Sequence, residues 1–147
     1  MNIIYYENKL IKIVDDTKIT SLNGNLQEYL NTLCLKNGSS LKGRIDSFNY
    51  ITKSKQKTPI VISFNNGEIL MPLLSIYSNY CILLNYCQIK KITKIDDNKT
   101  LVIFINDDKI EFDINFRIIN KQIKRVKSYI NYARLNNIYT NSFMYSI

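Results

Sequence analysis

The side chains of this sequence that could take part in chemistry are mostly cations. The 147 residues contain 20 Lys and Arg against 12 Asp and Glu, which gives a formal charge of +8, and no histidine. Lysine and arginine neutralise phosphates and release condensed counterions, so a basic balance favours nucleic acids and other polyanions as partners. An AT-rich coding sequence also enriches lysine, and charge alone therefore does not establish a nucleic-acid partner.

Two stretches of the sequence concentrate these cations. Residues 36–57 carry six cationic side chains against one acid, Asp46, and residues 117–134 carry cations and no acid. An ordinary solvated helix mixes charges of both signs, so an acid-free basic stretch points to an anionic partner. A solvated surface role is the alternative for any one lysine, and less so for Arg44, whose planar fork suits phosphate. The candidate DNA contacts are Lys42, Arg44, Lys53, Lys55, Lys57, Lys121, Lys124, Arg125 and Lys127.

Catalytic and metal chemistry have little support. Without histidine, and with no Cys-x-x-Cys spacing, a zinc site would need carboxylates, and the cysteines are expected to be buried thiols. Adjacent acids fall at predicted turns, where Asp is favoured for its backbone hydrogen bonds. We therefore expect no enzyme, no metal and no cofactor, with a metal-dependent nuclease as the enzymatic alternative. The residues concerned are Cys34, Cys81, Cys87, Asp15-Asp16, Asp96-Asp97 and Asp107-Asp108.

Three helices that could position the cations are predicted from apolar residues at steps of three and four. Asn25 can cap a first short helix, with Glu28 three residues later and Gly38 at the expected stop. Ser40 can cap a second short helix. A continuous apolar stripe predicts a long amphipathic helix from Phe116 onward. The stripe consists of Phe116, Ile119, Ile123, Val126, Ile130 and Ala133.

Runs rich in Ile, Val and Tyr predict the strands. Asn65-Asn66-Gly67 predicts a tight primed turn between two of them, because only residues that tolerate positive φ close such a turn. The expected strands are 2–6 and 10–14 in a first hairpin, 59–64 and 68–71 in a second, and 89–95, 100–105 and 109–114 in a meander.

Together these elements predict one α+β domain over residues 1–147. An antiparallel β meander follows two short helices, and the long C-terminal helix packs on the sheet. Residues 137–147 are expected to form a short tail that need not be ordered. No apolar run approaches the roughly 18 residues of a membrane span and no signal segment opens the chain, so a cytoplasmic protein is expected.

The central stretch carries a longer pattern in one register. Its residues are Gly38-Ser39-Ser40, Gly43-Arg44, Lys57-Thr58-Pro59-Ile60, Pro72 with Leu74-Ser75, and Cys81. This pattern resembles the ComK family of competence transcription factors, and the similarity extends over roughly residues 30–136. Leu73 and Leu83 depart from the family, which has Thr and Trp at these places. The glycine-rich segment from Gly38 to Arg44 does not have the P-loop pattern, and we expect it to form a turn between two helices.

This resemblance implies a transcriptional activator that binds double-stranded AT-rich DNA as a homo-oligomer, largely through the minor groove, and switches on DNA-uptake genes. Such a protein would be associated with the nucleoid, and RNA polymerase would be a partner. Family members also bind a Clp protease adaptor through a C-terminal tail, and Phe143, Met144 and Tyr145 resemble a degraded form of it. The alternative is a shortened ComK-like interaction protein that lacks specific DNA binding and acts through an oligomer partner or the adaptor.

Overall fold

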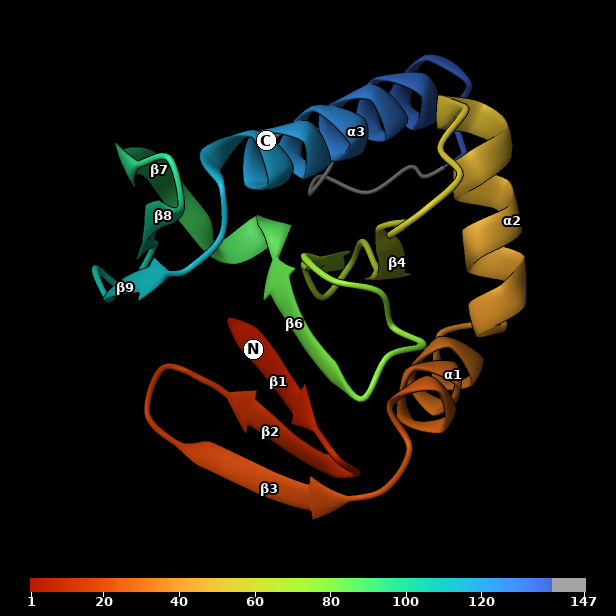
Figure 1. Cartoon of the computed structure of the whole chain (residues 1–147). Coiled ribbons are helices and arrows are strands. Elements are labelled where there is room, and N and C mark those ends of the chain that lie inside the picture. The colour runs from red at the N-terminus through yellow and green to blue at the C-terminus, as the bar shows by residue number, and fades with distance from the viewer. Residues whose placement is uncertain (139–147) are drawn as a thin grey trace.

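The computed structural model describes residues 1–138, and within them the chain forms two antiparallel sheets and three α-helices (Figure 1). The predicted α+β class is confirmed. The helices are α1 (Leu26–Lys36), α2 (Leu41–Thr52) and α3 (Phe116–Leu135). The strands are β1 (Ile3–Glu7), β2 (Leu10–Val14), β3 (Ile19–Asn23), β4 (Ile60–Ser63), β5 (Glu68–Pro72), β6 (Tyr80–Asn85), β7 (Ile89–Asp96), β8 (Lys99–Phe104) and β9 (Lys109–Phe112).

The larger sheet joins the two predicted hairpins through a strand that the sequence analysis missed. Its order is β3-β2-β1-β6-β5-β4, so β6 lies between the first hairpin and the second. The central residues of β6 form an unbroken apolar run. Such a run has no period that would distinguish a strand from a helix. β3 was missed as well, because its sequence Ile-Thr-Ser-Leu-Asn is mostly polar.

The predicted meander is confirmed, but it forms a sheet of its own with the order β7-β8-β9. The chain leaves the larger sheet at the buried Asn85. The Asn85 carboxamide oxygen accepts from the N–H groups of Ile69 and Cys87, and its nitrogen donates to the carbonyls of Met1 and Gly67. A short 3₁₀ turn, Tyr86–Gln88, follows and redirects the chain into β7. The single predicted sheet is therefore wrong, since this turn divides the strands into two.

The turn between β4 and β5 also differs from its prediction. A primed type I′ turn needs positive φ at both central residues. Here only Gly67 takes a positive φ, 65°, and Asn66 donates its N–H to the Ser63 hydroxyl at 3.1 Å. The hairpin is present as predicted, while the turn that closes it is longer and is not of the primed type.

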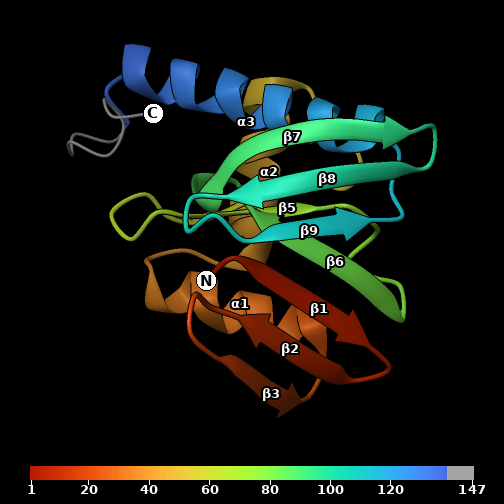
Figure 2. The same ribbon diagram turned by 90° about the vertical axis from the view of Figure 1, so that its left-hand side faces the viewer.

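The core lies on both faces of the larger sheet. On one face α1 packs through Leu26, Leu30 and Cys34. On the other face α3 and the meander enclose a second cluster, in which the rings of Phe48 and Tyr129 stack at 4.8 Å between centroids. Figure 2 shows α3 running alongside β7 at one end of the molecule, with β1 to β3 at the other end.

The glycine- and serine-rich motif forms the junction between α1 and α2, as predicted. Gly38 takes a positive φ of 88°, and the Ser40 hydroxyl caps α2 by accepting from the Gly43 N–H at 3.0 Å. A Cβ on Gly43 would lie 2.9 Å from the Ser39 hydroxyl oxygen, so glycine leaves room for the capping hydroxyls. Arg44 Nη2 donates back to the carbonyl of Asn37, the C-cap residue of α1, at 2.9 Å. The motif therefore holds the two helices together.

Candidate nucleic-acid interface

Helix α3 carries the longest acid-free basic surface of the described chain. Asn115 caps it by accepting from the Arg117 N–H at 2.8 Å, which is consistent with a helix that starts at Phe116. The inward residues of the predicted stripe are buried, notably Ile119, Val126 and Ala133. The helical period then places the cations on the flanks and on the outer face, in contact with solvent.

A buried glutamine fixes a lysine-bearing loop, residues 53–58, against α3. Gln122 is 2% exposed, and its Nε2 donates to the carbonyls of Lys57 and Pro72, both at 2.6 Å. The sequence analysis did not identify Gln122 as important. The available signal was its position, since it lies three residues after Ile119 and four before Val126, on the apolar side of the helix.

Arg125 extends the same network. Its Nη1 donates to the carbonyl of Gln56 and to Oε1 of Gln122, both at 3.0 Å. Burial lowers the pKa of Arg125, because the guanidinium loses part of its hydration. Arg125 therefore positions the loop, and it brings Lys57 and Lys121 to the rim of one shallow hollow of about 140 Å³.

The other loop lysines lie close to this network. Lys53 ends α2 in the left-handed conformation with φ 61°, and its Nζ lies 5.0 Å from the centre of the Tyr50 ring. Lys55 and Lys57 line a second hollow of about 350 Å³, whose opposite wall includes Ile76. Lys53, Lys55 and Lys57 are all exposed. The structure thus joins loop 53–58 to the basic helix through the backbone carbonyls of Gln56 and Lys57.

Two of the candidate residues lie elsewhere. Lys42 and Arg44 are at the first turn of α2, and a helix of 12 residues separates the first turn from Lys53 by roughly 16 Å. Lys42 pairs with Asp46 at 2.6 Å, and Arg44 is half-buried at the junction with α1. The basic stretch 42–57, continuous in sequence, is therefore divided between the two ends of α2 (Figure 1).

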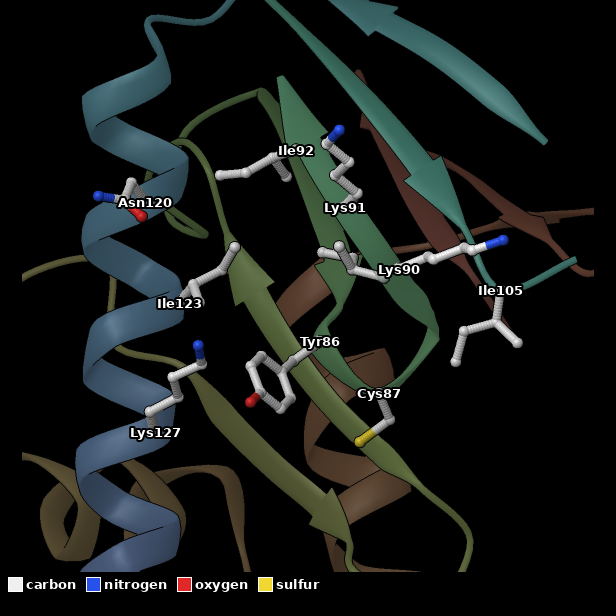
Figure 3. A pocket seen from close by; sticks show the side chains of 10 residues that line it. Tyr86, Cys87, Lys90, Lys91, Ile92, Ile105, Asn120, Ile123 and Lys127 are labelled. Atoms are coloured by element: carbon white, nitrogen blue, oxygen red, sulfur yellow. The ribbon is translucent and has the colours of Figure 1, made fainter. Parts of the chain in front are cut away.

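The remaining helix cations do not line the hollow beside loop 53–58. Lys124 is exposed, and Lys127 lines a groove that faces β7, together with Lys90 and Lys91 (Figure 3). These two lysines of β7 were not among the candidates. The adjacent pair was visible in the sequence, but only the tertiary structure brings β7 next to the helix.

Most of these lysines are not neutralised within the described chain. The side-chain ion pairs of residues 1–138 that lie within 4.0 Å are Lys42–Asp46, Lys90–Asp107 and Lys94–Asp97. The loop lysines and the lysines of α3 have no carboxylate at that distance. Their charge is therefore available to an external anion. These lysines are Lys53, Lys55, Lys57, Lys121, Lys124 and Lys127.

The groups considered for catalysis or metal binding have other environments. Burial raises the pKa of Cys81 and that of Cys87 to about 12, so both thiols are protonated at neutral pH. Asp96 accepts from the Asn98 N–H at 2.8 Å, which confirms its predicted role in a turn. Among residues 1–138, no three acidic, thiol or imidazole side chains are grouped so that they could hold a metal ion.

Three further observations bear on the sequence expectations. Leu73 and Leu83, the departures from the family pattern, are both fully buried, so they lie in the core and not on the exposed surface. The proposed adaptor-binding residues Phe143, Met144 and Tyr145 lie outside the described residues. No helix in residues 1–138 has the length and apolar character needed to cross a membrane.

Comparison with known proteins agrees with the pattern in the central stretch. A family model described as ComK protein matches residues 2–136, which is a longer span than the one recognised from motifs. No curated protein and no solved structure gives a significant match. Because the family model covers nearly the whole chain, the protein belongs to the ComK family of competence transcription factors.

Proposed function

We propose that this protein is a transcriptional activator that binds AT-rich promoter boxes as an oligomer and activates genes for DNA uptake. The observation that carries the proposal is the acid-free basic surface of α3, to which Gln122 and Arg125 fix the lysines of loop 53–58. A surface assembled from two distant parts of the chain presents its charges in one fixed arrangement. That arrangement suits a regular array of phosphates better than isolated surface lysines would.

The preference for AT-rich DNA has a physical basis. A-tracts have a narrow minor groove with an enhanced negative potential, which attracts inserted Arg and Lys side chains. In this proposal, phosphate contacts from Lys121 and Lys124 orient the protein, and the lysines of loop 53–58 enter the groove. Lys42 and Arg44 remain candidates only for a second contact, because they lie at the far end of α2.

The proposal is tested by fluorescence anisotropy with two labelled duplexes of equal length, one with paired A-tract boxes and one scrambled and GC-rich. Each is titrated over a range of salt concentrations. We expect tighter binding to the A-tract duplex, and a difference that persists as salt rises. The Lys121→Gln/Lys124→Gln variant should reduce the slope of log K against log salt by about 2, roughly one for each lost phosphate contact.

A matched control uses lysines of other elements, Lys18 before β3 and Lys36 at the end of α1. Lys18→Gln/Lys36→Gln removes the same charge from two exposed lysines outside the basic surface, and it should leave the slope nearly unchanged. Equal losses in both double variants would mean that only net charge matters. Equal binding of the wild-type protein to both duplexes would instead favour a ComK-like interaction protein, acting through an oligomer partner or a protease adaptor.

A further inference from the structure

A groove between α3 and β7 has a composition that DNA binding does not explain. Asn120, Ile123 and Lys127 line it from α3, and the segment from Tyr86 to Ile92 lines it from the other side (Figure 3). Its volume is about 420 Å³, which is within the range of roughly 300–1,000 Å³ typical of small-molecule sites. The groove is thus large enough for a compact organic molecule.

The floor of the groove is apolar. Ile123 from α3 and Ile92 from β7 point toward one another across it, and the Tyr86 ring lies beside them (Figure 3). These three side chains are partly buried and pack against the main core, of which they form the outer margin. A phosphate backbone would leave this apolar surface in contact with water, whereas a ligand with an apolar body would cover it.

The polar groups of the groove favour an anion. Lys91 and Lys127 have no carboxylate within 4.0 Å in residues 1–138, while Lys90 is paired with Asp107 at 3.0 Å. Among residues 1–138, no acidic side chain lines the groove. Burial raises the pKa of Tyr86, so its phenol is neutral at physiological pH and can donate a hydrogen bond.

From these features we propose that the groove between α3 and β7 binds a small amphipathic organic anion, with its apolar body between Ile92 and Ile123 and its acidic group near Lys127. The partly buried thiol of Cys87, which has a pKa of about 12, lines the groove as an apolar group and not as a nucleophile. The bound ligand would lie beside the basic surface of α3, so its binding would affect the binding of DNA to that surface.

The test uses the full-length protein and 8-anilinonaphthalene-1-sulfonate, which combines an aromatic body with one sulfonate and fluoresces when it leaves water. We expect saturable binding to a single site. Lys127→Glu should weaken binding by about tenfold or more, whereas Lys124→Glu, on the exposed side of the same helix, should leave it unchanged. Octanoate should displace the probe, and both octanol and inorganic phosphate should displace it much less.

Several outcomes would overturn the proposal. One is no saturable binding, and another is equal binding by the two glutamate variants. A loss of binding in Ile19→Ser would show that the probe binds at another place. That place would be the larger hollow that Leu10 of β2, Ile19 of β3 and Tyr80 of β6 line. Displacement by phosphate as strong as by octanoate would indicate a simple anion site, and displacement only by duplex DNA would assign the cations to nucleic acid.

A second measurement does not depend on the variants. In the wild-type protein, titration with octanoate should shift the amide NMR signals of Ile92 and Ile123 more than those of Leu10 and Ile19. The reverse pattern would also reject the proposed site. Unfolding curves of Lys127→Glu and Lys124→Glu should coincide with that of the wild type, because both side chains are exposed.

Discussion

Replacement of Gln122 by leucine tests whether one buried side chain assembles the basic surface. Leucine is similar in size but donates no hydrogen bond, so the carbonyls of Lys57 and Pro72 would each lose a partner at 2.6 Å. Arg125 would also lose its acceptor on Gln122, although it would keep its bond to the carbonyl of Gln56. The charge of the protein does not change, so any effect on DNA binding must come from the position of the loop.

The expected loss of stability follows from the environment of the two carbonyls. A buried polar group left without a partner costs about 1–3 kcal/mol. The Pro72 carbonyl is buried at this bond and should be near the upper end of that range, whereas the Lys57 carbonyl is only partly buried and can find water. We therefore expect a total loss of ~3 kcal/mol, which lowers Tm by ~10 °C in a chain of this size.

Two assays separate the local effect from the global one. Thermal unfolding measures the loss of stability, and Gln56→Leu is the matched control, because Gln56 has an exposed side chain and contributes only its backbone carbonyl. Limited trypsin digestion below the transition measures loosening of the loop, and we expect faster cleavage after Lys55 and Lys57 in Gln122→Leu only. Equal Tm values and equal cleavage rates in Gln122→Leu and wild type would refute this account of the interface.

Other predictions concern the helix junction, the core and pH. Arg44→Ala should destabilise the protein by about 1.5–3 kcal/mol in urea unfolding, because its guanidinium bonds the α1 C-cap carbonyl. Lys42→Ala, which breaks only an exposed ion pair, should leave the unfolding curve close to that of the wild type. Phe48→Ala should cost about 3–5 kcal/mol in the same assay, since this fully buried ring stacks on α3. The folded thiols of Cys81 and Cys87 have raised pKa values of about 12, so between about pH 8.5 and that value only the unfolded chain loses these protons, and stability falls as pH rises. Urea unfolding from about pH 8 to about pH 10.5 should show this decline, and a Cys81→Ala/Cys87→Ala variant should show a shallower one.

Local patterns in the sequence predicted the helices well, because caps and periodic apolar stripes act over a few residues. Asn25 accepts from the Glu28 N–H and Ser40 from the Gly43 N–H, as their positions indicated. The strand content was predicted less completely. β6 has no alternating pattern because both of its faces are buried, and its pairing with β1 joins residues about eighty positions apart.

For the candidate site, too, the sequence predicted local properties but not the contacts between distant segments. Charge and the absence of acids identified the lysines of α3 and of loop 53–58 from the sequence alone, since these are properties of composition. Their grouping depends on Gln122, which contacts a carbonyl 65 residues away. Arg44, a candidate DNA contact from the sequence, also bonds the Asn37 carbonyl and so holds two helices together, a role that the sequence did not indicate.

By itself, the sequence determined the helices, the two hairpins, the meander and the excess of positive charge, because each depends on neighbouring residues or on composition. The tertiary structure decided which cations share a surface. It separated Lys42 and Arg44 from Lys53 by the length of α2, and it placed Lys90 and Lys91 across a groove from Lys127. These relations depend on hydrogen bonds and packing between distant segments, for which a single sequence carries no local signal.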